Sequence, residues 1–125
     1  MTELTILDGG MGTELMARGL SSSNGIWSAQ ALVEEPEKVA EVHRDYIKAG
    51  ARVIITNSYS TIPSYLGKAG LADEYRRYTQ LAGEIARRAA DEFDEQVLVA
   101  GSLPPLGESY RYDMAPADDE ALPIY

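Results

Sequence analysis

The residues of this sequence that are best suited to chemistry follow three short apolar runs. The first run leads into Asp8, Gly9 and Gly10, within the segment ILDGGMGTEL. A partly desolvated carboxylate at a strand end would pair well with a cation, such as the ammonium group of an amino-acid ligand. The same carboxylate could instead cap the next turn or helix, and the sequence leaves both roles open. The two glycines could permit close approach of a ligand, although a turn with positive φ is the plainer account.

The other two apolar runs also end in polar or glycine residues. Thr56, Asn57 and Ser58 follow the second run. Gly101 and Ser102 follow the third run. Their hydroxyl and amide groups could hydrogen-bond a ligand, whereas polar loop residues more often satisfy the loop backbone. Ligands of parallel α/β proteins meet the carboxyl ends of the strands, so we expect these groups to share one rim.

Other residues of chemical interest stand alone in the sequence. Trp27, the only tryptophan, could wall off a pocket or stack on a cation, although a single tryptophan is more often a core residue. His43, the only histidine, is expected on a helix surface or in a second packing layer rather than in catalysis. Tyr110, Arg111 and Tyr112 could close over a ligand from a long loop, or simply pack against their own domain. Neither a GxGxxG motif after a strand nor a Walker A motif is present.

Three strands and the helices between them must position these residues. Short apolar runs without alternation are typical of parallel strands that are covered on both faces. Strands are predicted over residues 4–7, 53–56 and 97–100. Helices are predicted over residues 13–18, 28–33, 36–49, 63–68 and 72–93. This alternation implies a parallel sheet with right-handed crossovers, followed after Gly101 by a long loop and the start of a helix at Asp118.

The composition fits one globular domain without extracellular features. The chain has 125 residues, of which 45% are hydrophobic and 25% charged. Its net charge of −9 argues against nucleic acid and anionic membranes as partners. The absence of cysteine excludes disulfides and any thiolate metal site built from this chain alone. Because we find neither a signal peptide nor a membrane span, we expect a cytoplasmic protein.

Three segments together resemble the homocysteine S-methyltransferase family. They are ILDGGMGTEL, IWSAQALVEEPEKVAEVHRDYIKAGARVIITNSYSTIPSYLGKAGL and VLVAGSLPPLGESYR, in order and over nearly the whole chain. The resemblance implies a (β/α)8 barrel with parallel strands and outer helices, of which residues 1–125 would form the N-terminal part, about three βα units. It also implies transfer of a methyl group to the sulfur of homocysteine, which gives methionine. The donor would be S-methylmethionine, S-adenosylmethionine, betaine or a methylfolate.

The resemblance also assigns residues to substrate binding. They are Asp8, Gly9, Gly10, Trp27, Thr56, Asn57 and Ser102. Asp8 matches the aspartate that helps to hold the homocysteine amino group, and Gly9 and Gly10 match the glycine pair beside it. Trp27 lies where some members place an aromatic residue near the donor. The other three residues match the rim at the ends of the second and third strands.

The sequence departs from the family in its metal ligands and its length. The family holds zinc with three cysteines from later strands, which stabilises the homocysteine thiolate, and this chain has no cysteine. A (β/α)8 barrel usually needs about 250 residues. We therefore expect an incomplete barrel, a fragment or truncated gene product, that is inactive alone. Its third strand would have an unpaired edge, which association of identical copies would bury. The alternative is a non-catalytic half-barrel that serves as a binding or assembly module.

Overall fold

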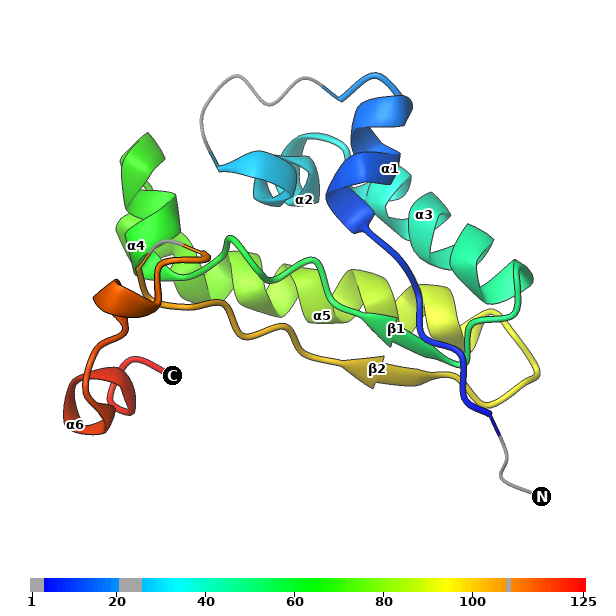
Figure 1. Cartoon of the computed structure of the whole chain (residues 1–125). Helices are drawn as coiled ribbons and strands as arrows, with labels where there is room; N and C mark the ends of the chain where they lie inside the picture. Colours follow the sequence, from blue (N-terminus) through cyan, green and yellow to red (C-terminus); the bar gives the residue numbers. More distant parts are fainter. Residues whose placement is uncertain (1–3, 21–25, 108) are drawn as a thin grey trace.

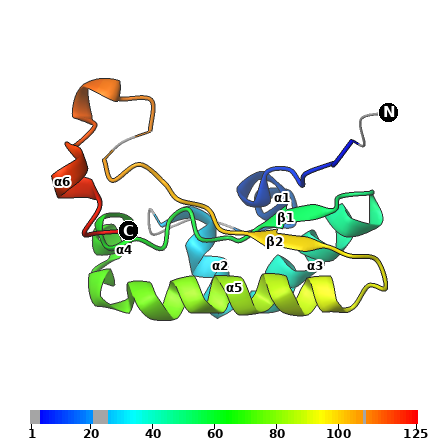
Figure 2. The same cartoon turned by 90° about the horizontal axis from the view of Figure 1, so that it is seen from below.

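Two long helices cover one face of a small parallel sheet (Figure 1). The computed structural model describes residues 4–20, 26–107 and 109–125, without the side chain of Trp27. The helices are α3 (Pro36–Lys48) and α5 (Tyr75–Asp91), and the strands are β1 (Val53–Ile55) and β2 (Leu98–Ala100). Figure 2 shows this helical layer lying along the strands. The arrangement confirms a mixed α/β chain with parallel strands.

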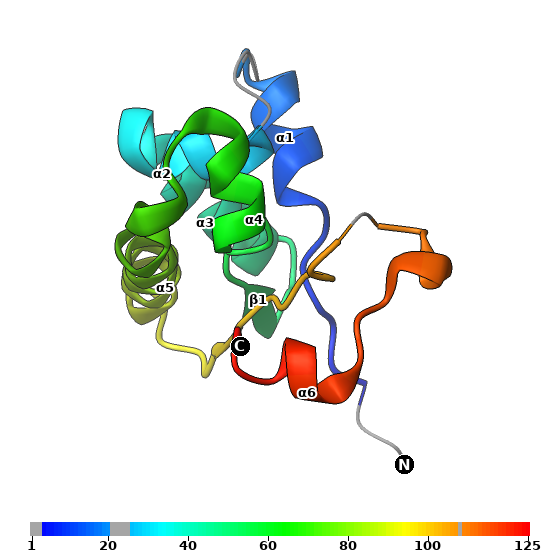
Figure 3. The same cartoon turned by 90° about the vertical axis from the view of Figure 1, so that its left-hand side faces the viewer.

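Shorter helices complete the chain. They are α1 (Met11–Ala17), η1 (Trp27–Gln30), α2 (Ala31–Glu34), α4 (Pro63–Leu66), η2 (Gly67–Ala69), η3 (Ala72–Glu74), η4 (Tyr112–Met114) and α6 (Asp118–Ala121). The helix predicted from Asp118 is confirmed as α6, and among the described residues of the loop before it η4 is the only helical turn. Figure 3 shows that the segment from η4 to α6 stands apart from α3 and α5.

Local sequence signals explain the position of α3. Pro36 occupies the first turn, where its missing N–H breaks no helical hydrogen bond. The helix ends at Lys48, and Gly50 follows with a φ of 111°, a conformation that glycine adopts without strain. The buried face of α3 consists of Val39, Ala40, Val42, His43 and Ile47. This pattern confirms the helix predicted over residues 36–49.

The strands pair in parallel register, with Ile54 of β1 opposite Val99 of β2. The predicted strand over residues 4–7 is wrong as a strand: only Leu7 forms a bridge, to Val53. The amide of Asp8 donates to the carbonyl of Val53 at 3.0 Å, which continues this contact. The amides of Arg52 and Val53 both donate to the carbonyl of Ile6, at 2.9 and 3.3 Å, so this segment contacts the start of β1 without forming a regular ladder.

The two faces of the sheet differ in burial. Ile54 faces α3 and α5, is fully buried and packs with Ile47 and Val97. Leu98 points to the opposite face and is 55% exposed. The prediction that both faces are covered is therefore wrong for the described part of the chain. Within that part, no strand pairs with the outer edge of β2.

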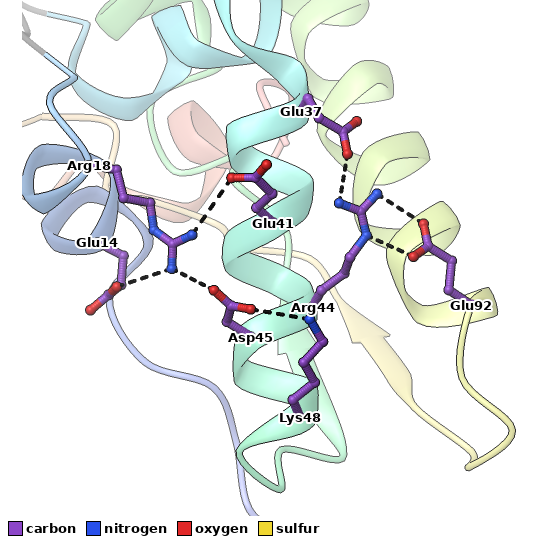
Figure 4. Close-up of polar contacts among 8 residues, drawn as sticks. All are labelled: Glu14, Arg18, Glu37, Glu41, Arg44, Asp45, Lys48 and Glu92. Carbon is purple, nitrogen blue, oxygen red and sulfur yellow. Dashed lines mark hydrogen bonds and ion pairs between the residues drawn. The ribbon is translucent and has the colours of Figure 1, made fainter.

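Ion pairs join the helices at the surface (Figure 4). Arg18 of α1 binds Asp45 of α3 at 2.8 Å. Arg44 of α3 binds Glu37 on its own helix at 2.7 Å and donates to both carboxylate oxygens of Glu92, just after α5. The hydrogen bonds that Arg44 donates, first to Glu92 and then to Glu37, raise the pKa of Arg44, and Arg44 in turn lowers the pKa of Glu92. These exposed pairs fix helix orientation more than they add stability.

None of the described helices combines the length and the apolar character that crossing a bilayer requires.

Candidate functional site

A cavity of about 640 Å³ lies at the carboxyl ends of β1 and β2. Five of the predicted binding residues line it together: Gly9, Gly10, Thr56, Asn57 and Ser102. The expectation that the three segment ends share one rim agrees with this placement. Parallel strands bring the residues that follow them to the same edge, which is why groups so far apart in sequence meet here.

Asp8 lies next to this cavity and fastens its first segment to β1. Its Oδ2 accepts a hydrogen bond of 2.8 Å from the amide of Ile55, a residue that lines the cavity. Its Oδ1 is buried and has no hydrogen-bond partner in the described chain. Burial raises the pKa of Asp8, and the hydrogen bond from Ile55 opposes that rise. The carboxylate thus has one oxygen in use and one left to accept a bond.

The alternative role of Asp8 as a helix cap is wrong. The N-cap residue of α1 is Gly10, and no side chain forms a capping hydrogen bond there. The side chain of Asp8 reaches across to β1 instead. The sequence could not separate these roles, because both use a carboxylate at the same position.

The glycine pair has a different cause from the one expected. Neither Gly9 nor Gly10 has positive φ, so the predicted left-handed turn is wrong. A Cβ atom on Gly9 would lie 2.7 Å from the hydroxyl oxygen of Tyr46 and 3.0 Å from its ring. The Tyr46 hydroxyl also donates to the carbonyl of Gly10 at 3.4 Å. Gly9 is therefore needed because the ring of Tyr46, from α3, packs directly against the backbone.

Asn57 uses its side chain to hold η1 beside the strand tip. It is only 4% exposed. Its Nδ2 donates to the carbonyl of Ser28 at 2.8 Å, and its Oδ1 accepts from the Ser28 hydroxyl at 2.5 Å. The Ser28 hydroxyl is thus committed to Asn57, and η1 begins at Trp27, one residue before the helix predicted over residues 28–33.

Hydroxyl groups connect the ends of β1 and β2. The hydroxyls of Thr56 and Ser58 lie 2.8 Å apart. The Ser58 hydroxyl donates to the carbonyl of Ser102 at 3.1 Å and accepts from its amide at 3.2 Å. The Thr56 amide donates to the carbonyl of Ala100 at 2.8 Å. Much of this polar cluster therefore satisfies loop backbone, the plainer of the two roles expected from the sequence.

An aromatic group that the sequence analysis missed lines the other end of the cavity. The rings of Tyr59 and Tyr65 meet edge to face, with centroids 5.8 Å apart. The Tyr59 hydroxyl hydrogen-bonds the Ser109 hydroxyl. The Tyr65 hydroxyl donates to the carbonyl of Gly107 at 3.3 Å. These contacts connect the long loop to the residues after β1. The paired residues are more than 40 positions apart, so no local sequence pattern predicts their contact.

The loop residues singled out from the sequence divide between two places. Tyr110 lines the same cavity, while its side chain is otherwise exposed. Arg111 and Tyr112 line a neighbouring cavity of about 490 Å³ with Tyr110 and Tyr125. Arg111 also forms an ion pair of 2.7 Å with Asp113. Only Tyr110 is therefore placed to meet a ligand at the strand tips.

The remaining two candidates do not contribute described side chains to the cavity. The backbone of Trp27 begins η1, and its side chain lies outside the described part of the structure. His43 is fully buried in α3, so of the two positions expected for it, helix surface or packing layer, it occupies a packing position. Both of its ring nitrogens lack hydrogen-bond partners in the described chain, and burial lowers its pKa to about 4. It is a core residue, as the plainer interpretation of a lone histidine allows.

The residues present do not fit the zinc site that the family resemblance implies. The sequence contains no cysteine, so a set of three cysteine ligands cannot be assembled from it. Among the described residues, no three histidine, aspartate or glutamate side chains gather closely enough to hold a metal ion. No chemical step is therefore assigned to zinc on this chain.

Comparison with known proteins identifies related sequences and structures. Residues 5–125 match the family described as homocysteine S-methyltransferase. The homocysteine S-methyltransferase of Escherichia coli K12 is 39% identical over 112 residues, which cover 84% of this chain and 36% of that protein. The homocysteine S-methyltransferase YbgG of Bacillus subtilis is 36% identical over 138 residues, which cover 98% of this chain and 44% of that protein.

A solved structure shows the same likeness in three dimensions. The crystal structure of the homocysteine methyltransferase MmuM from Escherichia coli, in its metallated form, superposes with a TM-score of 0.75 and 39% identity. The match covers 83% of this chain and 38% of the MmuM chain. The chain thus spans less than half the length of these relatives.

Proposed function

This chain belongs to the homocysteine S-methyltransferase family, and we propose that its strand-tip cavity binds homocysteine as the methyl acceptor. The reaction would move a methyl group from a small donor to the sulfur of homocysteine and give methionine. The chain would contribute the substrate-binding rim of that enzyme, as an incomplete (β/α)8 barrel domain over residues 1–125. Its parallel strands and outer helices support that architecture.

The observation that carries the proposal is the half-satisfied carboxylate of Asp8. Its Oδ2 is held by Ile55, which fixes the orientation of the group, and its Oδ1 is buried without a partner. A buried oxygen without a hydrogen bond costs free energy that a correctly placed donor recovers. The ammonium group of an amino acid is such a donor, and its charge matches the carboxylate.

The other rim residues would surround the rest of the substrate. Gly9 and Gly10 have no side chains to obstruct a ligand, and both line the cavity beside Asp8. Thr56 and Ser102 supply hydroxyl and backbone groups at the tips of β1 and β2. Asn57 would act indirectly, because its side chain is engaged with Ser28. In this arrangement the chain binds and orients homocysteine.

The chemical step needs a sulfur nucleophile that this chain alone does not generate. The thiol must lose its proton, because the thiolate is the reactive form. Its electron pair then forms the new carbon–sulfur bond in line with the bond that breaks, whose electrons leave with the donor. Among the described residues that line the cavity there is no carboxylate or imidazole side chain to take that proton. We therefore expect the purified chain to form no methionine, and zinc-dependent methionine formation by it would contradict this expectation.

A second candidate function follows from the open face of the sheet. Leu98 and Leu7 are each 55% exposed on the described chain, and the outer edge of β2 has no partner there. An apolar face and a free strand edge are typical of association surfaces. The chain could therefore serve as a non-catalytic assembly module through association of identical copies.

A ligand titration that probes Asp8 tests the proposed function. L-Homocysteine should raise the melting midpoint of the chain, because a ligand of the folded state stabilises it. The Asp8→Asn variant should lose that shift: its amide oxygen can still accept from Ile55, while the charge that pairs with ammonium is gone.

A ligand that lacks the amino group is the matched control. 4-Mercaptobutanoate keeps the thiol and the carboxylate of homocysteine, so any shift that it causes should be smaller than the homocysteine shift and equal in the two proteins. An equal homocysteine shift in the parent chain and in Asp8→Asn would contradict the role of Asp8. The absence of any homocysteine shift in the parent chain would contradict the proposed function itself.

A further inference from the structure

The strand-tip cavity has two chemically different ends. The end near Asp8 is built from glycines and hydroxyl groups, as described above. The other end is lined by Tyr59, Tyr65, Lys68, Ser109 and Tyr110. Lys68 is the only residue with a charged side chain among the described residues that line the cavity. The cavity volume of about 640 Å³ lies in the range that is typical of small-molecule sites.

The ammonium group of Lys68 is held in place by an aromatic ring. Its Nζ lies 4.7 Å from the centroid of the Tyr65 ring. The ring itself is fixed, because Tyr65 is only 7% exposed and packs edge to face against Tyr59. A cation over the face of an aromatic ring is stabilised without being neutralised. The charge of Lys68 therefore remains available to a ligand.

Lys68 is also unusual among the cations of this acidic chain. The chain has a net charge of −9, and its lysines and arginines, all within the described residues, form ion pairs except Lys68 and Arg76. Both exceptions lie over tyrosine rings. Arg76 packs on Tyr75 and does not line the cavity, whereas Lys68 does. Of the two cations without a carboxylate partner among the described residues, only Lys68 lies at the cavity.

We propose that Lys68 binds the carboxylate group of a small ligand in this cavity. This assignment rests on the proposed function for the identity of that ligand, which would be homocysteine or a methyl donor that carries a carboxylate. Lysine offers a single point charge with three donors, which suits a carboxylate at a solvent-facing site. Asp8 and Lys68 would then mark the cationic and anionic ends of ligand recognition.

The test compares each ligand with its own carboxamide. The ligands are L-homocysteine, S-methyl-L-methionine and propionate, each paired with the corresponding amide, and affinity is measured from amide chemical shifts of the ¹⁵N-labelled chain. The parent chain should bind the carboxylate of at least one pair about three- to fivefold more tightly than its amide, the range for an exposed charge pair. The pair that shows the preference identifies the source of the carboxylate.

Three substitutions make the test specific. Lys68→Gln should remove the preference, and Lys68→Arg should keep it, because arginine carries the same charge and also stacks on tyrosine. Arg76→Gln is the matched control, since it removes the other tyrosine-stacked cation outside the cavity. It should behave like the parent chain. Well-dispersed spectra for each variant would verify folding.

The outcomes separate the two proposals. If Lys68→Gln keeps the preference while homocysteine still binds, the assignment of Lys68 is wrong and the proposed function stands. If propionate or S-methyl-L-methionine shows a Lys68-dependent preference while homocysteine does not bind, the assignment stands and the proposed function is wrong. If none of these ligands binds the parent chain, both are wrong.

Discussion

The two faces of the sheet differ sharply, although the strands that form them are continuous. Ile54 faces α3 and α5 and is fully buried, whereas Leu98, which pairs with Val53 across the two strands, faces outward and is 55% exposed. Side chains on one strand alternate between faces, so a single register decides both environments. We infer that contacts with the helical layer stabilise the described chain, whereas the open face is available for association with another molecule.

The largest effect should come from the covered face. Ile54→Ala removes a fully buried side chain from the cluster with Ile47 and Val97, which should cost about 2–5 kcal/mol in the free energy of unfolding. Urea denaturation measures this value. If the alanine variant does not fold, Ile54→Val can be measured instead, and it should lose only about 1 kcal/mol. Leu98→Ala is the matched control on the open face. Equal losses at both positions would contradict the division between the faces.

The helical layer should also make stability depend on pH through His43. Burial lowers the pKa of His43 to about 4 in the folded chain, against 6.5 for a free side chain. Between these values the unfolded state binds a proton that the folded state excludes. The free energy of unfolding should therefore fall by about 3 kcal/mol as the pH drops from 6.5 to 4, and His43 should contribute no further loss below that.

A variant without the titrating group isolates this contribution. His43→Leu places an apolar side chain of similar size in the core. It should remove the part of the change in the free energy of unfolding between pH 6.5 and 4 that His43 causes. Urea titrations of both proteins over this range provide the measurement, with the carboxylates common to both. A parallel pH dependence of the two proteins would show that His43 does not titrate in this way.

The glycine pair tests how the helical layer positions the candidate site. Gly9→Ala places a methyl group 2.7 Å from the hydroxyl oxygen of Tyr46, so the ring of Tyr46 must move. We expect a loss of about 1–3 kcal/mol in the free energy of unfolding, as for other overpacked positions. Gly10→Ala is the matched control, because its nearest contact is the Thr13 hydroxyl at 3.4 Å.

A double-mutant cycle can attribute the effect to Tyr46. Combining Gly9→Ala with Tyr46→Ala should recover most of the loss that the glycine substitution alone causes, because the space for the methyl group is then open. Additive losses in chemical denaturation would mean that Gly9 is required for another reason. The comparison also separates a structural role of Gly9 from its proposed contact with homocysteine.

The sequence predicted those elements whose signals are local. Pro36 and Gly50 bound α3 within a few residues of its ends, and the apolar runs at Ile54 and Val99 were sufficient for β1 and β2. The run at residues 4–7 carried the same signal, yet it forms a single bridge to β1, because composition alone does not decide whether a regular ladder forms.

The site was predictable only in outline. The predicted parallel topology placed the residues after each strand at one rim, and residues from all three segment ends do line one cavity. The contacts that decide individual roles connect distant positions: Tyr46 reaches Gly9, Asn57 binds Ser28, and residues 107 and 109 meet the tyrosines after β1. No spacing rule in one sequence encodes such long-range pairs. The family resemblance supplied the rim residues, and the structure supplied the reasons for the glycine and the asparagine.

The smallest effect on stability should come from the open face, where association is the sensitive measurement. Leu98→Lys places a charge on an exposed position of β2, so the free energy of unfolding should change by less than about 0.5 kcal/mol. If identical copies associate through this face, sedimentation velocity should show a concentration-dependent dimer in the parent chain and a monomer in Leu98→Lys, because a charge at an edge strand opposes pairing.

The same charge placed elsewhere on the surface is the control for Leu98→Lys. Met16→Lys alters an exposed apolar residue of α1, on the helical side of the molecule, and should leave association unchanged. A parent chain that stays monomeric at all concentrations would contradict the hypothesis that identical copies associate through the open face. Loss of association in both variants would show that net charge, rather than the sheet face, controls it, since each substitution adds the same charge to an acidic chain.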